Sequence, residues 1–313
     1  MAPGMSAPQP RVLAIFGPTA SGKSAVAEAV VARIPAEIVS ADAMQVYRAL
    51  PLLTNQPSAP TRLVAIWPLG YEASVAEYAA LAHEGVDDIL AAGRTPIVVG
   101  GTGLYLRAAL ADLDLPPAPP PGVREHYERL YDDSGSERAH ALLAERDPAA
   151  AAAVHPNDRR RVVRALELTE TGETLAPPRS RLWTGEMRHP TLVFGLEVPK
   201  EVLEARIETR TRAMFELGVE EEVGKARTRP ISRTARQIIG LREIGELPRD
   251  QAITAIARRT AQYAAYQRKW MRRIPGLVRL RADRPPAAVA ADLVAAARGE
   301  SRLRGNEISG RRT

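Results

Sequence analysis

Eight residues near the start of the chain match the phosphate-binding motif G-x-x-x-x-G-K-[ST] at every fixed position. They are Gly17, Pro18, Thr19, Ala20, Ser21, Gly22, Lys23 and Ser24. The glycines let backbone N–H groups turn towards a phosphate, Lys23 adds a full positive charge, and the Ser24 hydroxyl can ligate Mg2+. An apolar run at residues 12–16 precedes the motif, and apolar residues at helical spacing follow it. This pattern predicts a site for a di- or triphosphate without saying which compound binds.

Two further segments place polar residues directly after expected strands. Asp42 follows a strand at residues 38–40, and the glycine-rich segment around Thr102 follows a strand at residues 96–99. Ligands of open α/β sheets bind at the carboxyl ends of the strands, so both side chains are expected near the phosphate site. Asp42 suits a general base, a partner of magnesium or a helix cap. Thr102 suits a ligand contact, but a tight turn alone also accounts for the neighbouring glycines.

Arginines gather at two other places that could bind an anion. Arg206 and Arg210 lie one helical turn apart and could clamp a diphosphate leaving group, or could simply face solvent. Four arginines crowd the start of another expected helix, where the helix dipole disfavours positive charge. They are Arg159, Arg160, Arg161 and Arg164. This placement suggests an anionic partner, with a salt-bridged surface as the alternative.

The elements that must position these residues alternate between strands and helices. Strands are expected at residues 12–16, 38–40, 63–67, 96–99, 191–197 and 277–280, and the main helices at 23–33, 74–93, 201–222 and 250–274. The alternation predicts an α/β fold with a P-loop NTPase-like parallel sheet flanked by helices. A proline-rich linker at 115–121 introduces an all-helical segment. We therefore expect a discontinuous core domain at 11–115 and 190–285, with a helical insertion domain at 122–187.

Composition excludes several classes of protein. The chain has 313 residues, a formal net charge of +6 and no cysteine, which rules out a disulfide scaffold, a thiolate metal site and a cysteine nucleophile. No apolar run approaches the roughly 20 residues of a membrane-spanning helix, so a cytoplasmic protein without a membrane partner is expected. Residues 206–273 hold twice as many basic as acidic side chains, and residues 299–313 are polar and arginine-rich. The latter predict a disordered basic tail.

Five segments together resemble the tRNA dimethylallyltransferase family. They are residues 17–24, 42–47, 99–105, 157–167 and 237–242, and the resemblance runs in order from about residue 12 to residue 275. It implies transfer of the dimethylallyl group of dimethylallyl diphosphate to the exocyclic N6 amine of the adenosine 3′-adjacent to the anticodon. The acceptors would be tRNAs that read codons starting with U. The resemblance also implies Mg2+ as cofactor, the tRNA anticodon stem-loop as partner, and a monomer.

The resemblance also implies roles for individual residues. Asp42 would be the general base, with Thr102 beside it in the catalytic group, and Ser24 would ligate the metal. The diphosphate would lie on the eight-residue loop and, less securely, on Arg206 and Arg210. The tRNA would contact Asp42, Ala43, Met44, Gln45, Thr102, Arg124, Arg160, Arg161, Val162, Val163, Arg164, Gln237, Ile238, Ile239, Gly240, Leu241 and Arg242.

Three other readings of the same residues remain open at this point. A P-loop small-molecule kinase shares the loop and a basic C-terminal third, but it does not predict arginines clustered in a helical insertion. A transferase of the same group to free adenine nucleotides would need less basic surface. A non-enzymatic RNA-binding ATPase module would leave Asp42 and Thr102 without a role.

Overall fold

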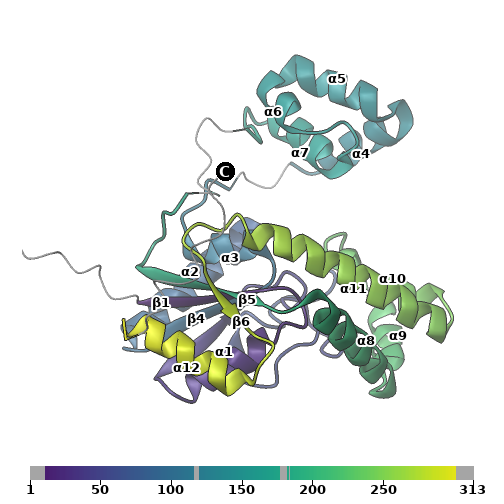
Figure 1. Ribbon diagram of the computed structural model, residues 1–313. Helices are drawn as coiled ribbons and strands as arrows, with labels where there is room; N and C mark the ends of the chain where they lie inside the picture. Colours follow the sequence, from purple (N-terminus) through teal and green to yellow (C-terminus); the bar gives the residue numbers. More distant parts are fainter. Residues whose placement is uncertain (1–10, 116–119, 177–181, 183, 301–313) are drawn as a thin grey trace, which may run out of the picture. The chain divides into compact units, whose positions relative to one another are not determined.

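The computed structural model describes residues 11–115, 120–176, 182 and 184–300, and their contacts divide the chain into two compact units (Figure 1). The larger unit comprises Met1–Asp112 and Gly185–Thr313, and the smaller one Leu113–Thr184. Most of the predicted basic tail, from residue 301 onwards, lies outside the described residues.

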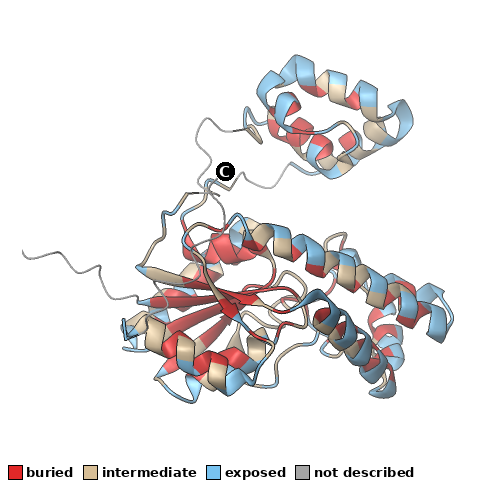
Figure 2. Ribbon diagram, in the orientation of Figure 1, coloured by how far each residue is buried: buried red, intermediate tan, exposed pale blue. Residues whose placement is uncertain are grey.

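The larger unit is built on six parallel strands in the order β3-β2-β4-β1-β5-β6. The strands are β1 (Val12–Phe16), β2 (Ala36–Ser40), β3 (Thr61–Arg62), β4 (Thr95–Gly100), β5 (Thr191–Glu197) and β6 (Val278–Arg281). All residues of β1 are buried, as expected for a central strand whose two faces are both covered by helices (Figure 2). The predicted parallel α/β fold is confirmed.

Helices of the larger unit fall into two groups. Those that cover the sheet are α1 (Lys23–Val31), α2 (Val75–Ala91), α3 (Gly103–Leu110) and α12 (Pro286–Ala297). Those of the C-terminal third are α8 (Lys200–Glu216), α9 (Val219–Arg227), α10 (Leu241–Glu246) and α11 (Arg249–Met271), with a short 3-10 helix at Ala235–Gln237. Helices α1 and α12 pack on one face of the sheet, while α8 and α11 lie side by side beyond one end of it (Figure 1).

Local sequence signals account for several of these boundaries. Ser74 and Glu77 form a reciprocal capping box that begins α2. The strand expected at residues 63–67 is wrong, because Leu63 and Ala65 have positive φ values of 64° and 53° that no strand tolerates. The single helix expected at 201–222 is also wrong, because Gly218 at φ 90° separates α8 from α9. Helices α3 and α12 were not expected from the sequence.

In the described residues of the smaller unit, four helices surround a core of their own. They are α4 (Val123–Ser134), α5 (Ser136–Arg146), α6 (Pro148–Ala153) and α7 (Arg159–Thr169). Tyr127, Leu143 and Leu166 pack at the centre of this core. Two aspartates start helices here, because Asp147 caps the amide of Ala150 and Asp158 caps that of Arg161.

Candidate active site

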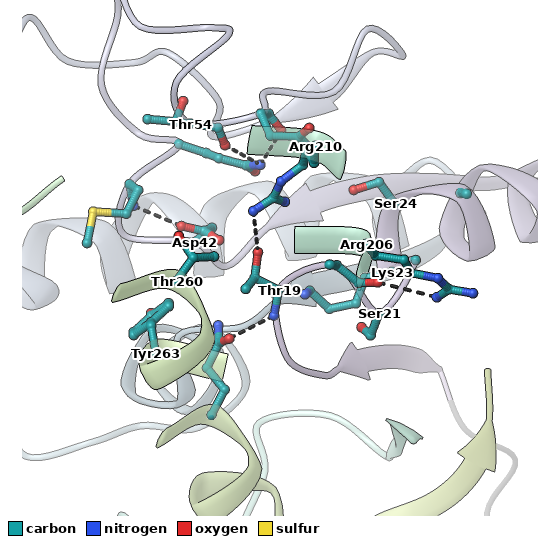
Figure 3. Close-up of a pocket in the computed structure, with 18 of the residues that line it drawn as sticks. Thr19, Ser21, Lys23, Ser24, Asp42, Thr54, Arg206, Arg210, Thr260 and Tyr263 are labelled. Atoms are coloured by element: carbon teal, nitrogen blue, oxygen red, sulfur yellow. Dashed lines mark hydrogen bonds between the residues drawn. The ribbon is translucent and has the colours of Figure 1, made fainter. Parts of the chain in front are cut away.

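The loop between β1 and α1 leaves the first turn of the helix open to an anion (Figure 3). Ala20 and Gly22 have positive φ values of 63° and 88°, so the chain turns sharply before α1 begins at Lys23. The N-cap residue of this helix is Gly22, which has no side chain to cap the first turn. N–H groups at an uncapped helix start carry partial positive charge and bind phosphate. The geometry therefore fits the phosphate site that the sequence motif predicts.

Lys23 lies at the centre of this site with its charge only partly stabilised. Its Nζ donates to the carbonyl of Pro18 at 2.8 Å. Desolvation lowers the pKa of Lys23 to about 8, the Asp42 charge opposes that shift, and the Arg210 charge adds to it. An incoming phosphate would restore the missing negative partner, so Lys23 is suited to bind an anion rather than to stabilise the fold.

Two arginines of α8 reach the same loop. Arg206 donates to the carbonyl of Ala20 at 3.3 Å, and Arg210 donates to the hydroxyl of Thr19 at 3.0 Å (Figure 3). Burial lowers the pKa of Arg210, and the Asp42 charge opposes that shift. Within the described residues, neither arginine has a carboxylate within ion-pair distance, and the same holds for Lys23. Three cations thus surround a loop that holds no anion of its own.

Asp42 lies on the other side of the same cavity, directly after β2. Its Oδ1 accepts the N–H of Met44 at 2.9 Å, and its other oxygen forms no hydrogen bond within the described residues. Asp42 and the phosphate loop line one cavity of about 500 Å³. A carboxylate held near a phosphate site, yet not neutralised by an ion pair, can accept a proton from a bound substrate.

Thr102 is not among the residues that line this cavity. Its Oγ1 instead accepts the N–H of Ala43 at 3.2 Å and lies 3.3 Å from the hydroxyl of Tyr263. Thr102 therefore holds the segment that follows Asp42 against helix α11.

The glycines beside Thr102 are required by close packing rather than by a turn. None of Gly100, Gly101 and Gly103 has positive φ. A Cβ on Gly100 would lie 2.0 Å from the Ala41 carbonyl oxygen, and one on Gly103 would lie 2.1 Å from the ring of Trp270. A tight turn therefore does not explain these glycines. They are needed because neighbouring segments leave no space for a side chain.

Helix α11 contributes side chains that the sequence analysis did not identify. Thr260, Tyr263 and Gln267 line the cavity, and Gln267 is 1% exposed. Its amide accepts the N–H of Thr19 and donates to the carbonyl of Gly101, both at 2.8 Å. No motif in the sequence marks Gln267, which lies within the helix expected at residues 250–274.

Apolar side chains complete the cavity. They come from several segments and include Met44, Leu53, Met214, Ile238, Ile239 and Ile256. Gly240 adjoins this group, because a Cβ on it would lie 2.5 Å from Leu53 and 3.4 Å from Ile256. A cavity with a cationic loop, a carboxylate and an apolar wall suits a ligand with a phosphate head and a short hydrocarbon group.

The segment at residues 237–242 contributes to the cavity only in part. Ile238 and Ile239 line it, whereas Gln237 and Arg242 are exposed. Gly240 and Leu241 are buried, and the Gly240 N–H is held by the carboxylate of Glu243 at 3.1 Å. The exposed pair is therefore available to a large partner, while the middle of the segment faces the cavity or the core.

In the helical unit the predicted RNA-contacting residues divide into exposed and buried ones. Arg160 and Arg161 are exposed at the start of α7. Val162 and Val163 are 0% and 3% exposed, and their side chains pack in the core of this unit. The buried Glu167 carboxylate binds both Arg124 and Arg164.

Hard oxygen donors are present where a divalent metal would be needed. Ser24 and Asp42 both line the cavity, and the described residues contain no group of three or more His, Asp or Glu side chains that could form a separate metal site. Mg2+ commonly takes few protein ligands and the remainder from phosphate oxygens and water. The residues present therefore fit a metal that is held mainly by a bound diphosphate. In the described part of the chain, no helix is long and apolar enough to cross a membrane.

The parallel sheet and its phosphate loop define a P-loop protein. The Asp42 carboxylate and the apolar wall beside this loop suit group transfer from a phosphorylated compound. The chain belongs to the IPP transferase family, whose model matches residues 45–274. A tRNA dimethylallyltransferase of Streptomyces coelicolor is 38% identical over 281 residues, which cover 86% of this chain and 89% of that protein. One of Anaeromyxobacter dehalogenans is 39% identical over 292 residues, with 90% and 98% covered.

Solved structures agree with this assignment. The tRNA isopentenylpyrophosphate transferase of Bacillus halodurans matches with a TM-score of 0.65 at 29% identity, over 94% of this chain and 99% of that one. A eukaryotic dimethylallyltransferase acting on tRNA matches with a TM-score of 0.72 at 25% identity, over 87% and 74%. The predicted family is confirmed.

Proposed function

We propose that this protein transfers the dimethylallyl group of dimethylallyl diphosphate to the N6 amine of the adenosine 3′-adjacent to the anticodon, in tRNAs that read codons starting with U. The observation that carries the proposal is one cavity that combines the phosphate loop, three cations without carboxylate partners, Asp42 and an apolar wall. Family membership supports the same activity.

The diphosphate would bind at the uncapped start of α1, with Lys23, Arg206 and Arg210 around it. During transfer a bond forms between the amine nitrogen and the allylic carbon, and the bond from that carbon to the diphosphate oxygen breaks. The diphosphate leaves with the bonding electron pair, so negative charge grows where these cations lie. Fixed positive groups that meet developing charge lower the barrier to departure. Mg2+, held by Ser24 and the phosphate oxygens, would supply further positive charge.

Asp42 would take the proton that the amine loses. An exocyclic amine of adenine is a weak nucleophile, and a positioned base typically contributes roughly 100-fold to 10,000-fold in rate. The Met44 N–H that binds Oδ1 orients the carboxylate. The apolar wall around Leu53 and Ile256 would accept the hydrocarbon group and exclude water, which otherwise competes as an acceptor.

The tRNA would be held by exposed basic side chains of both units. A base within an RNA loop must leave its stack to reach a pocket. Ala43, Met44 and Gln45 beside Asp42, together with Gln237 and Arg242, would contact the nucleotide that enters. In the helical unit, the exposed Arg160 and Arg161 would bind the phosphates of the anticodon stem-loop. Arg124 and Arg164, which bind the Glu167 carboxylate, would hold the helices that present them.

A transfer assay with labelled dimethylallyl diphosphate, Mg2+ and separate acceptors tests this proposal. The acceptors are an unmodified tRNA, the same tRNA with guanosine in place of the adenosine next to the anticodon, AMP and ATP. We expect label only in the first tRNA. Label in AMP or ATP would instead indicate a free-nucleotide transferase, and no label in any acceptor would return the kinase alternative to consideration.

A further inference from the structure

We propose that Gln267 is a positioning residue that locks the phosphate loop in its anion-binding shape and holds it in register with Asp42. The inference rests on the proposed function for its kinetic consequences, but its effect on anion binding is independent of it. Gln267 lies in α11 and is 1% exposed. Its side chain spans two loops, the one after β1 and the one after β4.

The oxygen and the nitrogen of the Gln267 amide each form a hydrogen bond, and the two partners determine the orientation of the amide. The Thr19 N–H can only donate, so it faces Oε1, and the Gly101 carbonyl can only accept, so it faces Nε2; both distances are 2.8 Å. A glutamine meets both demands, whereas a methionine of similar size meets neither. A glutamate meets both only when its carboxyl is protonated.

The backbone of Gly101 packs directly against the Gln267 side chain and the phosphate loop. A Cβ on Gly101 would lie 2.1 Å from Nε2 of Gln267 and 3.1 Å from the carbonyl oxygen of Gly17. Thr19 is held a second time through its hydroxyl, to which Arg210 donates at 3.0 Å. The loop is thus fixed from two sides before any phosphate binds, which lowers the ordering cost of binding.

The same helix also holds the segment that carries the base. Tyr263, one helical turn before Gln267, lies 3.3 Å from the Thr102 hydroxyl, and Thr102 binds the N–H of Ala43 next to Asp42. Helix α11 therefore contacts the phosphate loop directly through Gln267, and it reaches the Asp42 segment through Tyr263 and Thr102. Without the Gln267 hydrogen bonds, the phosphate loop would no longer be held at a fixed position relative to Asp42.

The test compares Gln267→Met, Gln267→Glu and the matched control Gln262→Met. Gln262 lies on the same helix and is exposed. Calorimetry with inorganic pyrophosphate and Mg2+ measures anion binding, the transfer assay gives kcat and both KM values, and thermal unfolding checks the fold. All variants are made in the full chain.

For Gln267→Met we expect pyrophosphate affinity to fall by about 10-fold and kcat by about 10-fold to 100-fold, because two buried backbone groups lose their partner. The KM for tRNA should change less than twofold, and Gln262→Met should bind pyrophosphate like the wild type. Unchanged pyrophosphate affinity and kcat in Gln267→Met would overturn the inference. A rise in the KM for tRNA alone would overturn it too, since Gln267 would then act on RNA.

Gln267→Glu keeps the inference testable if the methionine variant does not fold. Burial raises the pKa of a carboxyl, so the protonated form should restore both hydrogen bonds at low pH. We expect the pyrophosphate affinity of this variant, relative to the wild type, to recover at least threefold between pH 8 and pH 5.5. A ratio that does not vary with pH would overturn the inference. If the wild type binds pyrophosphate but transfers no prenyl group, the proposed function fails while the binding results still decide the role of Gln267.

Discussion

The cations at the phosphate site and the arginines of the helical unit have different kinds of partner. In the larger unit Lys23, Arg206 and Arg210 donate to carbonyl and hydroxyl oxygens, and no carboxylate in the described residues pairs with them. In the helical unit, Arg124 and Arg159 bind carboxylates. A desolvated cation without a counterion costs free energy that a bound anion can recover. The first arrangement is built to bind an anion, and the second holds helices together.

This difference shows that arginine density does not by itself locate an anion site. The start of α7 is the densest arginine cluster in the sequence, yet Arg159 and Arg164 there are neutralised by acidic neighbours. Only Arg160 and Arg161 stand exposed at that helix start. Any RNA affinity of this unit therefore depends on its surface residues, and it should be weaker per arginine and more sensitive to salt.

The largest expected effect comes from the carboxylate that faces the unpaired cations. Asp42→Asn should lower kcat by about 100-fold to 10,000-fold, because the amide cannot take the proton of the amine. Pyrophosphate affinity should stay constant or rise, since a negative charge near Lys23 is removed. Transfer rates at saturating substrates and calorimetry measure the two quantities. Asp132→Asn in the helical unit is the control, and near-normal turnover of Asp42→Asn would refute its role as base.

The next effect concerns one unpaired arginine. Arg210→Met should weaken pyrophosphate binding by about 10-fold to 100-fold, in line with the loss of a hydrogen bond to a charged group. It should not lower the thermal unfolding temperature, because no ion pair is lost. Arg159→Met in the helical unit should lower the thermal unfolding temperature and leave pyrophosphate affinity unchanged. If Arg210→Met lost stability but kept its pyrophosphate affinity, Arg210 would be a structural residue and not part of an anion site.

A smaller effect is expected from pH. Only protonated Lys23 attracts the diphosphate, and desolvation lowers its pKa to about 8. Pyrophosphate affinity should therefore be highest below that pH, and it should fall by up to about tenfold per pH unit above it. Since the Arg210 charge contributes to the lowered pKa, Arg210→Met should move the fall to higher pH. Calorimetry across pH 6.5 to 9.5 measures this, and Lys23→Met supplies the background titration of pyrophosphate itself.

A substitution in the helical unit should leave the diphosphate site unaffected. Arg124→Met leaves the fully buried Glu167 carboxylate with one arginine fewer, which should destabilise this unit by about 2 kcal/mol. Amide hydrogen exchange in α4 and α7 should accelerate accordingly, while pyrophosphate affinity stays as in the wild type. Unchanged exchange would mean that the ion pair contributes no stability.

Short-range patterns made much of the site predictable. The eight-residue loop, the strand before it and the helix after it lie within about twenty residues of one another, so their geometry follows from local backbone preferences. The same holds for the capping box at Ser74 and for the position of Asp42 at the end of β2. Local preference was insufficient at residues 63–67, where positive φ values break an apolar run, and at Gly218 between α8 and α9.

The sequence by itself determined that a phosphate loop starts a parallel α/β fold, because that information lies in neighbouring residues. The tertiary structure alone decided which cations lack carboxylates, why Gly101 has no side chain, and that Gln267 supports Thr19 from 248 positions away. These features arise where distant segments meet. Periodicity reports which face of a helix is buried but not what that face touches, so only the packed chain could reveal them.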